Sequence, residues 1–210
     1  MSEDTPTRIL KAALVGFSEL GYSGTSMRRI AAIVGVQAPS IYAHFSSKEA
    51  LLKALLERQG PVSGTALLEK ARSAASEPAQ VVDCFASGLI ESWCSDDARR
   101  FRGLYDRLPA DLKRQVSYLE AIEKLLDALT ALFRGWARDG RMRDDVPPRL
   151  LAWEFGAPIG NLRTSYWAWG QPPAVVRRGR RLAKAHVRYF ISCALEARPR
   201  SRSCGRGGPR

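Results

Sequence analysis

A short run of small and polar residues after Gly35 has the chemistry needed to contact a nucleic acid. Within it, Val36, Ile41 and Phe45 are the apolar residues that can anchor a short helix to a core. The other side chains are left for the outer surface: Gln37, Ala38, Pro39, Ser40, Tyr42, Ala43 and His44. Amide and hydroxyl groups pair with base edges and phosphate oxygens, and small residues let the backbone approach them closely. The run therefore predicts a surface that fits the major groove of a duplex.

Four helices are predicted to position this run. The first is expected to start at Thr5 and end at Gly21, and the second to start at Thr25 or Ser26 and end at Gly35. The third is expected to start at Pro39, and the fourth to run from Ser47 to near Gly60-Pro61. Apolar residues recur at helical spacing within them, which gives each helix an inward face. Two short helices joined by a glycine-containing turn and supported by an earlier helix are typical of a helix-turn-helix.

Four segments at matching separations resemble the DNA-binding domain of the TetR family of bacterial transcriptional regulators: Thr25–Ala31, Gly35-Val36, Pro39–Phe45 and Ser47–Leu52. The resemblance covers about residues 7–56. It implies an all-α fold, with a helix-turn-helix DNA-binding domain over residues 1–60 and a helical effector-binding and dimerisation domain over 61–197. Three positions depart from the family pattern: the family often has an acid in place of Arg29, Ala in place of Val34 and Ser in place of Gln37.

The resemblance also implies a set of DNA contacts. Phosphate oxygens would be held by Thr25 with the start of the second helix, by Tyr42, by His44 and by Lys48. The groove would be entered by Gln37, Ala38, Pro39 and Ser40, while Arg28 would reach a guanine edge or a phosphate. Gln37 is the expected adenine contact because its amide can pair with the N6/N7 edge.

Other interpretations of the same residues stay open. Tyr42 could be a core aromatic and His44 a hydrogen-bonded core histidine, although Tyr42 falls on a different helical face from Phe45. Arg28 could belong to a solvated face. The whole helix-turn-helix could also serve packing alone, against which stands its small and polar outer face.

Residues 61–210 continue with helical patterns and no convincing strand block. The patterns predict a helix after Pro78 and further helices over about 101–108, 112–136, 147–169 and 173–196. The whole chain would then have about nine helices. The last two long helices are those that the resemblance pairs with a second copy in a four-helix bundle. Small residues could allow close approach on the first of them (Gly156, Ala157, Gly160), and an apolar seam could form on the second (Val176, Ala183, Val187, Phe190, Ala194), unless both faces are buried within one subunit.

Large aromatic residues spread over several of these helices could line an apolar cavity for a small molecule. The predicted lining residues are Trp93, Tyr105, Trp136 and Trp153, with Arg163 as the polar partner of an anionic effector. Core packing is the alternative for each ring. A surface salt bridge is the alternative for Arg163.

Composition and charge exclude several classes of protein. No apolar run of about 20 residues that could span a membrane is present, and the uncharged stretch over 164–176 is interrupted by Gln171, Pro172 and Pro173. The N-terminus is acidic where a signal peptide would be basic, and we expect a cytoplasmic protein. The net charge is +12, yet residues 171–210 carry eleven Lys/Arg against the single acid Glu196. We expect residues 198–210 to form a disordered basic tail, either without function or adding salt-sensitive attraction to DNA.

No catalytic or metal-binding pattern is found. The four cysteines form no CxxC pair, and the two histidines, His44 and His186, do not stand at a zinc-ligand spacing from them. We therefore expect no enzyme, no metal and no cofactor. The expected function is a ligand-responsive transcriptional repressor that binds double-stranded DNA as a homodimer and leaves a palindromic operator when a small molecule binds. The alternative is a helical small-molecule-binding module without specific DNA binding.

Overall fold

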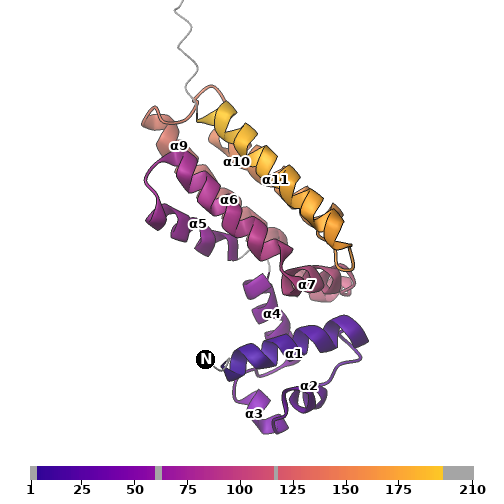
Figure 1. Ribbon diagram of the computed structural model, residues 1–210. Coiled ribbons are helices and arrows are strands. Elements are labelled where there is room, and N and C mark those ends of the chain that lie inside the picture. Colours follow the sequence, from indigo (N-terminus) through magenta and orange to yellow (C-terminus); the bar gives the residue numbers. More distant parts are fainter. Residues whose placement is uncertain (1–3, 60–62, 116–117, 196–210) are drawn as a thin grey trace, which may run out of the picture.

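The computed structural model describes residues 4–59, 63–115 and 118–195, which form eleven α-helices and no strand (Figure 1). The first four are α1 (Thr5–Leu20), α2 (Met27–Val34), α3 (Ala38–Tyr42) and α4 (Lys48–Gln59). They are followed by α5 (Ser63–Ala74), α6 (Pro78–Cys94), α7 (Asp96–Asp106), α8 (Ala110–Gln115), α9 (Tyr118–Arg138), α10 (Pro148–Ser165) and α11 (Pro173–Ala194). The predicted all-α fold is confirmed.

Two differences from the prediction bring the helices of the described residues from about nine to eleven. Helix α5 was not predicted, because few large apolar residues besides Leu67 and Leu68 mark its inward face. The single long helix predicted from about 112 to 136 is divided into α8 and α9, on either side of residues 116–117, which lie outside the described residues.

Short-range signals encode the turn between α2 and α3. Ser26 caps α2, because its Oγ accepts a hydrogen bond from the backbone N–H of Arg29. Gly35 ends α2 in the left-handed conformation, with φ of 77°, and its N–H donates back to carbonyls of that helix. Pro39 lies in the first turn of α3, where its missing N–H costs no helical hydrogen bond.

The first four helices share a hydrophobic core with α7. Its fully buried members include Ile9, Phe17, Ile30, Ile41, Leu51 and Phe101. Hydrogen bonds to Ser18 of α1 also join this helix to the region of α7. The guanidinium of Arg100 donates to Ser18 Oγ at 3.1 Å, and that of Arg107 donates to the Ser18 carbonyl at 2.9 Å. Helix α7 is therefore part of the support of the N-terminal helices, although it lies far from them in sequence.

A second core lies among α5, α6, α9, α10 and α11, which form an elongated bundle (Figure 1). At its centre, Phe133 packs against Phe155 and Phe190, with ring centroids 6.5 and 5.8 Å apart. Helix α4 runs from the N-terminal helices toward this bundle (Figure 1).

The described residues also bear on the expectations about membrane spans, metal sites and cysteines. Among the described helices, none combines the length and apolar character needed to cross a membrane. In the same residues, no cluster of acidic, histidine and cysteine side chains is arranged to hold a metal ion, and Cys84, Cys94 and Cys193 are free. The basic tail predicted over 198–210, which includes Cys204, lies outside the described residues.

Candidate DNA-reading surface and effector cavity

Helix α3 presents polar side chains around one buried anchor. Ile41 is completely buried, and Val36 and Phe45 pack partly buried against the same core, as predicted. The exposed residues on and beside α3 are Gln37, Pro39, Ser40, Tyr42, Ala43 and His44, and Ala38 is partly exposed. Since Tyr42 is 53% exposed and His44 is exposed, the alternative that they are core residues is wrong. We call these seven residues the reading surface.

Thr25 does not lie on the reading surface. Its side chain is completely buried, and its hydroxyl donates a hydrogen bond to the Gly21 carbonyl at 3.0 Å. The hydroxyl is therefore buried and already bonded within the protein, and the neighbouring Ser26 is the residue that caps α2. Arg28, in the first turn of the same helix, is exposed as predicted.

Lys48 is held at the start of α4 by a cluster that the sequence did not predict. Its ammonium donates to the Tyr22 carbonyl at 2.8 Å and lies 4.4 Å from the centre of the Tyr22 ring. The Tyr22 hydroxyl donates in turn to Glu49 Oε1 at 2.9 Å. Burial, together with this bond to a carboxylate, raises the pKa of the Tyr22 phenol far above its usual range. The cluster fixes the start of α4 against the turn that precedes α2.

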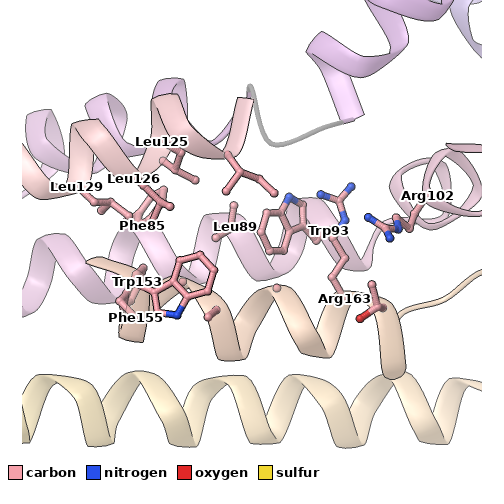
Figure 2. Close-up of a pocket in the computed structure, with 15 residues that line it drawn as sticks. Phe85, Leu89, Trp93, Arg102, Leu125, Leu126, Leu129, Trp153, Phe155 and Arg163 are labelled. Atoms are coloured by element: carbon pink, nitrogen blue, oxygen red, sulfur yellow. The ribbon is translucent and has the colours of Figure 1, made fainter. Parts of the chain in front are cut away.

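An apolar cavity of about 330 Å³ lies between α6, α7, α9 and α10 (Figure 2). It is lined by Phe85, Leu89, Trp93, Arg102, Ile122, Leu125, Leu126, Leu129, Trp153, Phe155, Gly156, Ala157, Gly160, Arg163 and Thr164. A volume of this size suits a small organic molecule. Except for Arg102, Arg163 and Thr164, the lining consists of apolar and small residues.

Three of the five predicted cavity residues line it, namely Trp93, Trp153 and Arg163. The other two do not. Trp136 is buried in the bundle core, where its ring stacks on Phe133 at 5.7 Å, and Tyr105 packs against the core of the N-terminal helices. Both follow the core-packing alternative: Trp136 lies about two turns of α9 beyond the lining residue Leu129, and Tyr105 packs beside Phe101.

Arg163 is the most deeply buried cation among the described residues, with 2% of its surface exposed. Its Nη2 donates to the carbonyl of Gln59 at 2.7 Å, and its guanidinium carbon lies 4.6 Å from the centre of the Trp93 ring. The predicted alternative of a surface salt bridge is therefore wrong. No sequence pattern indicates the Gln59 contact, which joins residues 104 positions apart.

The lining residues that the sequence did not predict are mainly aliphatic. Phe85 and Leu89 precede the predicted Trp93 at a spacing of four residues, so the helical face that the three share is visible in the sequence. The pattern does not reveal whether that face meets a cavity or a neighbouring helix. Arg102, on α7, had no signal that distinguishes it from the other arginines around it.

The residues expected to pair with a second copy lie in two different places. On α11, the seam formed by Val176, Ala183, Val187, Phe190 and Ala194 is buried within the same subunit. On α10, Gly156, Ala157 and Gly160 line the cavity. Other apolar side chains of these two helices are exposed, namely Leu150, Trp153, Leu182 and Tyr189.

Comparison with known proteins points to one family of regulators. A family model described as "Bacterial regulatory proteins, tetR family" matches residues 9–55. The HTH-type transcriptional regulator RutR of Escherichia coli O157:H7 is 30% identical over 152 residues, which cover 68% of this chain and 66% of that regulator. The match thus spans just under two thirds of the length of that relative.

Two further comparisons cover more of the proteins concerned. The HTH-type transcriptional regulator UidR of Escherichia coli K12 is 27% identical over 151 residues, which cover 71% of this chain and 72% of that regulator. Among solved structures, one similar to this chain is the complex of triclosan with SmeT, a Stenotrophomonas maltophilia repressor. The alignment covers 92% of this chain and 93% of the SmeT chain. Its TM-score is 0.69 at 22% identity, which shows a shared fold.

Proposed function

This chain belongs to the TetR family of bacterial transcriptional regulators, and on that premise we propose that it is a DNA-binding regulator that responds to a small molecule. The observation that carries the proposal is the reading surface, where polar and small side chains surround the buried anchor Ile41. A packing element would bury this face. The relatives RutR and UidR are both named HTH-type transcriptional regulators.

In the proposed complex, Gln37, Ala38, Pro39 and Ser40 enter the major groove. Gln37 pairs with an adenine, because its exposed amide carries both a donor and an acceptor. Tyr42, His44, Arg28 and Lys48 contact phosphates or, for Arg28, a guanine edge, and Thr25 takes part only through the backbone at the start of α2. Phosphate contacts position the domain, whereas base contacts select the sequence.

We propose that residues 1–60 act as the DNA-binding domain and residues 61–197 as the effector-binding and dimerisation domain. Two copies would meet through α10 and α11 and bind a palindromic operator, because a single short recognition helix gives little affinity. The exposed Leu182 and Tyr189 on α11 support this choice of face. The regulator would act as a repressor.

The proposed effector site is the cavity between α6, α7, α9 and α10. That SmeT is solved with triclosan supports a small-molecule site in this fold. A bound effector changes DNA affinity only through its different affinities for a DNA-binding and a DNA-released conformer. Helix α4 is the natural connection, since Lys48 begins it beside the reading surface and Gln59 ends it at Arg163.

Selection of bound duplexes from a random pool by the purified protein tests this proposal. A recovered motif with two symmetric half-sites is expected, with affinity that falls steeply as salt increases. Gln37→Ala should weaken binding by about tenfold and relax the sequence preference at one position, since a good base contact contributes about 1–3 kcal/mol. Gln80→Ala removes the same amide from an exposed position on α6 and should bind like the wild type. Recovery of no motif would instead favour a small-molecule-binding module without specific DNA binding.

A further inference from the structure

The cavity has two chemically distinct ends. Toward one end it is lined by aliphatic and aromatic side chains, whereas the guanidinium groups of Arg102 and Arg163 lie together beside Trp93 at the other (Figure 2). We propose that the effector is an amphipathic anion: an apolar body that ends in a carboxylate, with the carboxylate held by Arg163. This inference rests on the proposed function, because it specifies the effector of that regulator.

Burial makes Arg163 the main recognition group. Arg163 is 2% exposed, so its guanidinium is poorly solvated. An anion placed next to it is therefore stabilised by a stronger electrostatic attraction than at the surface. The planar fork of an arginine also matches the two oxygens of a carboxylate in a bidentate pair. An uncharged head group of the same size would fill the space without this electrostatic attraction.

Arg102 has a secondary role at the rim of the cavity. Its side chain is 19% exposed and forms an ion pair with Asp106 at 2.9 Å. Water and Asp106 both weaken the attraction that it exerts on an anion. We therefore expect Arg163, and not Arg102, to decide between a carboxylate and an uncharged head group.

The same arginine connects the cavity to the DNA-binding end of the molecule. Its Nη2 holds the carbonyl of Gln59, the last residue of α4. The guanidinium is one rigid plane with five N–H donors, so a carboxylate bound by its other donors sets the orientation of that plane and with it the strength of the bond to Gln59. The Arg163–Gln59 hydrogen bond is therefore the contact through which a bound carboxylate reaches α4.

Titration of the DNA-free protein with three probes of equal chain length tests the head-group preference. Decanoate, 1-decanol and decylamine are followed by tryptophan fluorescence, since Trp93 and Trp153 line the cavity, and by calorimetry. At neutral pH, decanoate should bind about tenfold more tightly than 1-decanol, as expected for a charge-assisted hydrogen bond, and decylamine most weakly. Equal binding of decanoate and 1-decanol, or no binding of any probe, would overturn the inference.

Two variants assign the preference to one residue. Arg163→Gln should lose the preference for decanoate while its affinity for 1-decanol stays within about twofold of the wild type. Arg102→Gln is the matched control and should keep most of the preference. Retention of the full preference in folded Arg163→Gln would contradict the proposal. Should that variant fail to fold, the comparison of probes on the wild type still decides whether the cavity selects an anion.

A second measurement addresses the connection to α4. Decanoate should release the wild-type protein from its selected duplex and should not release Arg163→Gln. Release of both proteins at equal decanoate occupancy would overturn the role of the Arg163–Gln59 bond. The probe titrations contain no DNA, so an absent head-group preference overturns this inference alone, whereas an absent duplex motif overturns the proposed function, and with it the role as effector, but not the anion preference of the cavity.

Discussion

Ser26 and Ser40 are 14 positions apart and have opposite roles in the structure. The Ser26 hydroxyl accepts a hydrogen bond from the backbone of α2 and satisfies one of the free N–H groups at its start. Ser40 is exposed on the reading surface. The same residue type therefore stabilises the fold in one place and is available for DNA in the other.

This difference gives a paired prediction for two substitutions. Ser26→Ala should lower the free energy of unfolding by about 1 kcal/mol, the usual cost of losing an N-cap. Ser40→Ala should leave the stability unchanged and weaken binding to the selected duplex. Urea unfolding and a fluorescence-anisotropy titration measure the two effects separately. A stability loss in Ser40→Ala as large as that in Ser26→Ala would contradict the assignment.

The Glu49 carboxylate at the start of α4 makes stability depend on pH. Backbone hydrogen bonding at Glu49, the Ser47 side chain and the Tyr22 hydroxyl together hold the pKa of the Glu49 carboxyl below its usual value. Because the pKa is lower in the folded state, the stabilisation is complete above the pKa of the unfolded chain. It is lost as the pH falls through the folded-state pKa.

Removal of this carboxylate should therefore flatten the acid limb of the stability curve. Urea unfolding measured from neutral pH to about pH 3 should show a smaller loss of stability for Glu49→Gln than for the wild type. Glu57→Gln removes an exposed acid from the same helix and serves as the control. Identical acid limbs for Glu49→Gln and the wild type would rule out this contribution.

At the scale of the elements, contact between α11 and the end of α10 depends on a small residue. A Cβ added to Gly179 would lie 2.5 Å from Trp167 Nε1 and 2.6 Å from Tyr166 Cβ. Trp167 is completely buried and cannot move aside easily. The glycine thus sets how closely α11 approaches the chain segment that follows α10.

Two glycine-to-alanine substitutions should accordingly have opposite effects. Gly179→Ala should destabilise the protein by about 1–3 kcal/mol, the usual cost of overpacking a core. Gly135→Ala lies in α9, where an added Cβ meets nothing within 4 Å, and should stabilise by about 0.5–1 kcal/mol because alanine favours a helix. Thermal unfolding of the two variants and of the wild type measures whether each substitution lowers or raises the stability. A rise in Tm for Gly179→Ala would show that the close contact with Trp167 does not exist in solution.

At the scale of the whole molecule, the two cores meet through helices that are not adjacent in sequence. Helix α7 contributes Phe101 to the core of the N-terminal helices and Arg102 to the cavity. Helix α4 ends at Gln59, against Arg163 of α10. The cavity and the reading surface are therefore linked by both α4 and α7.

The proposed homodimer gives a prediction at the same scale. Leu182→Arg introduces a charge on the exposed face of α11 and should convert a dimer into a monomer, with a large loss of affinity for a palindromic duplex. Leu119→Arg makes the same change at an exposed leucine of α9 and should remain dimeric. Sedimentation velocity and a DNA titration report both properties. A Leu182→Arg variant that remains dimeric would place the interface elsewhere.

The sequence alone determined the helix-turn-helix and the helical class of the chain. Ser26, Gly35 and Pro39 act through bonds to near neighbours and through their own backbone preferences, so their effects are visible without a fold. The same holds for Ile41, whose spacing from Phe45 already marked the inward side of α3. Local spacing fixes which residues share a helical face.

Only the tertiary structure decided what each face meets. Trp93 and Trp153 line the cavity while Trp136 fills a core, although all three are tryptophans on amphipathic helices. The apolar residues of α11 were equally compatible with a partner subunit and with the subunit's own core, and the structure buries them in the latter. Arg163 meets Gln59 across 104 positions of sequence, and no local pattern can encode a contact that depends on how two distant helices pack.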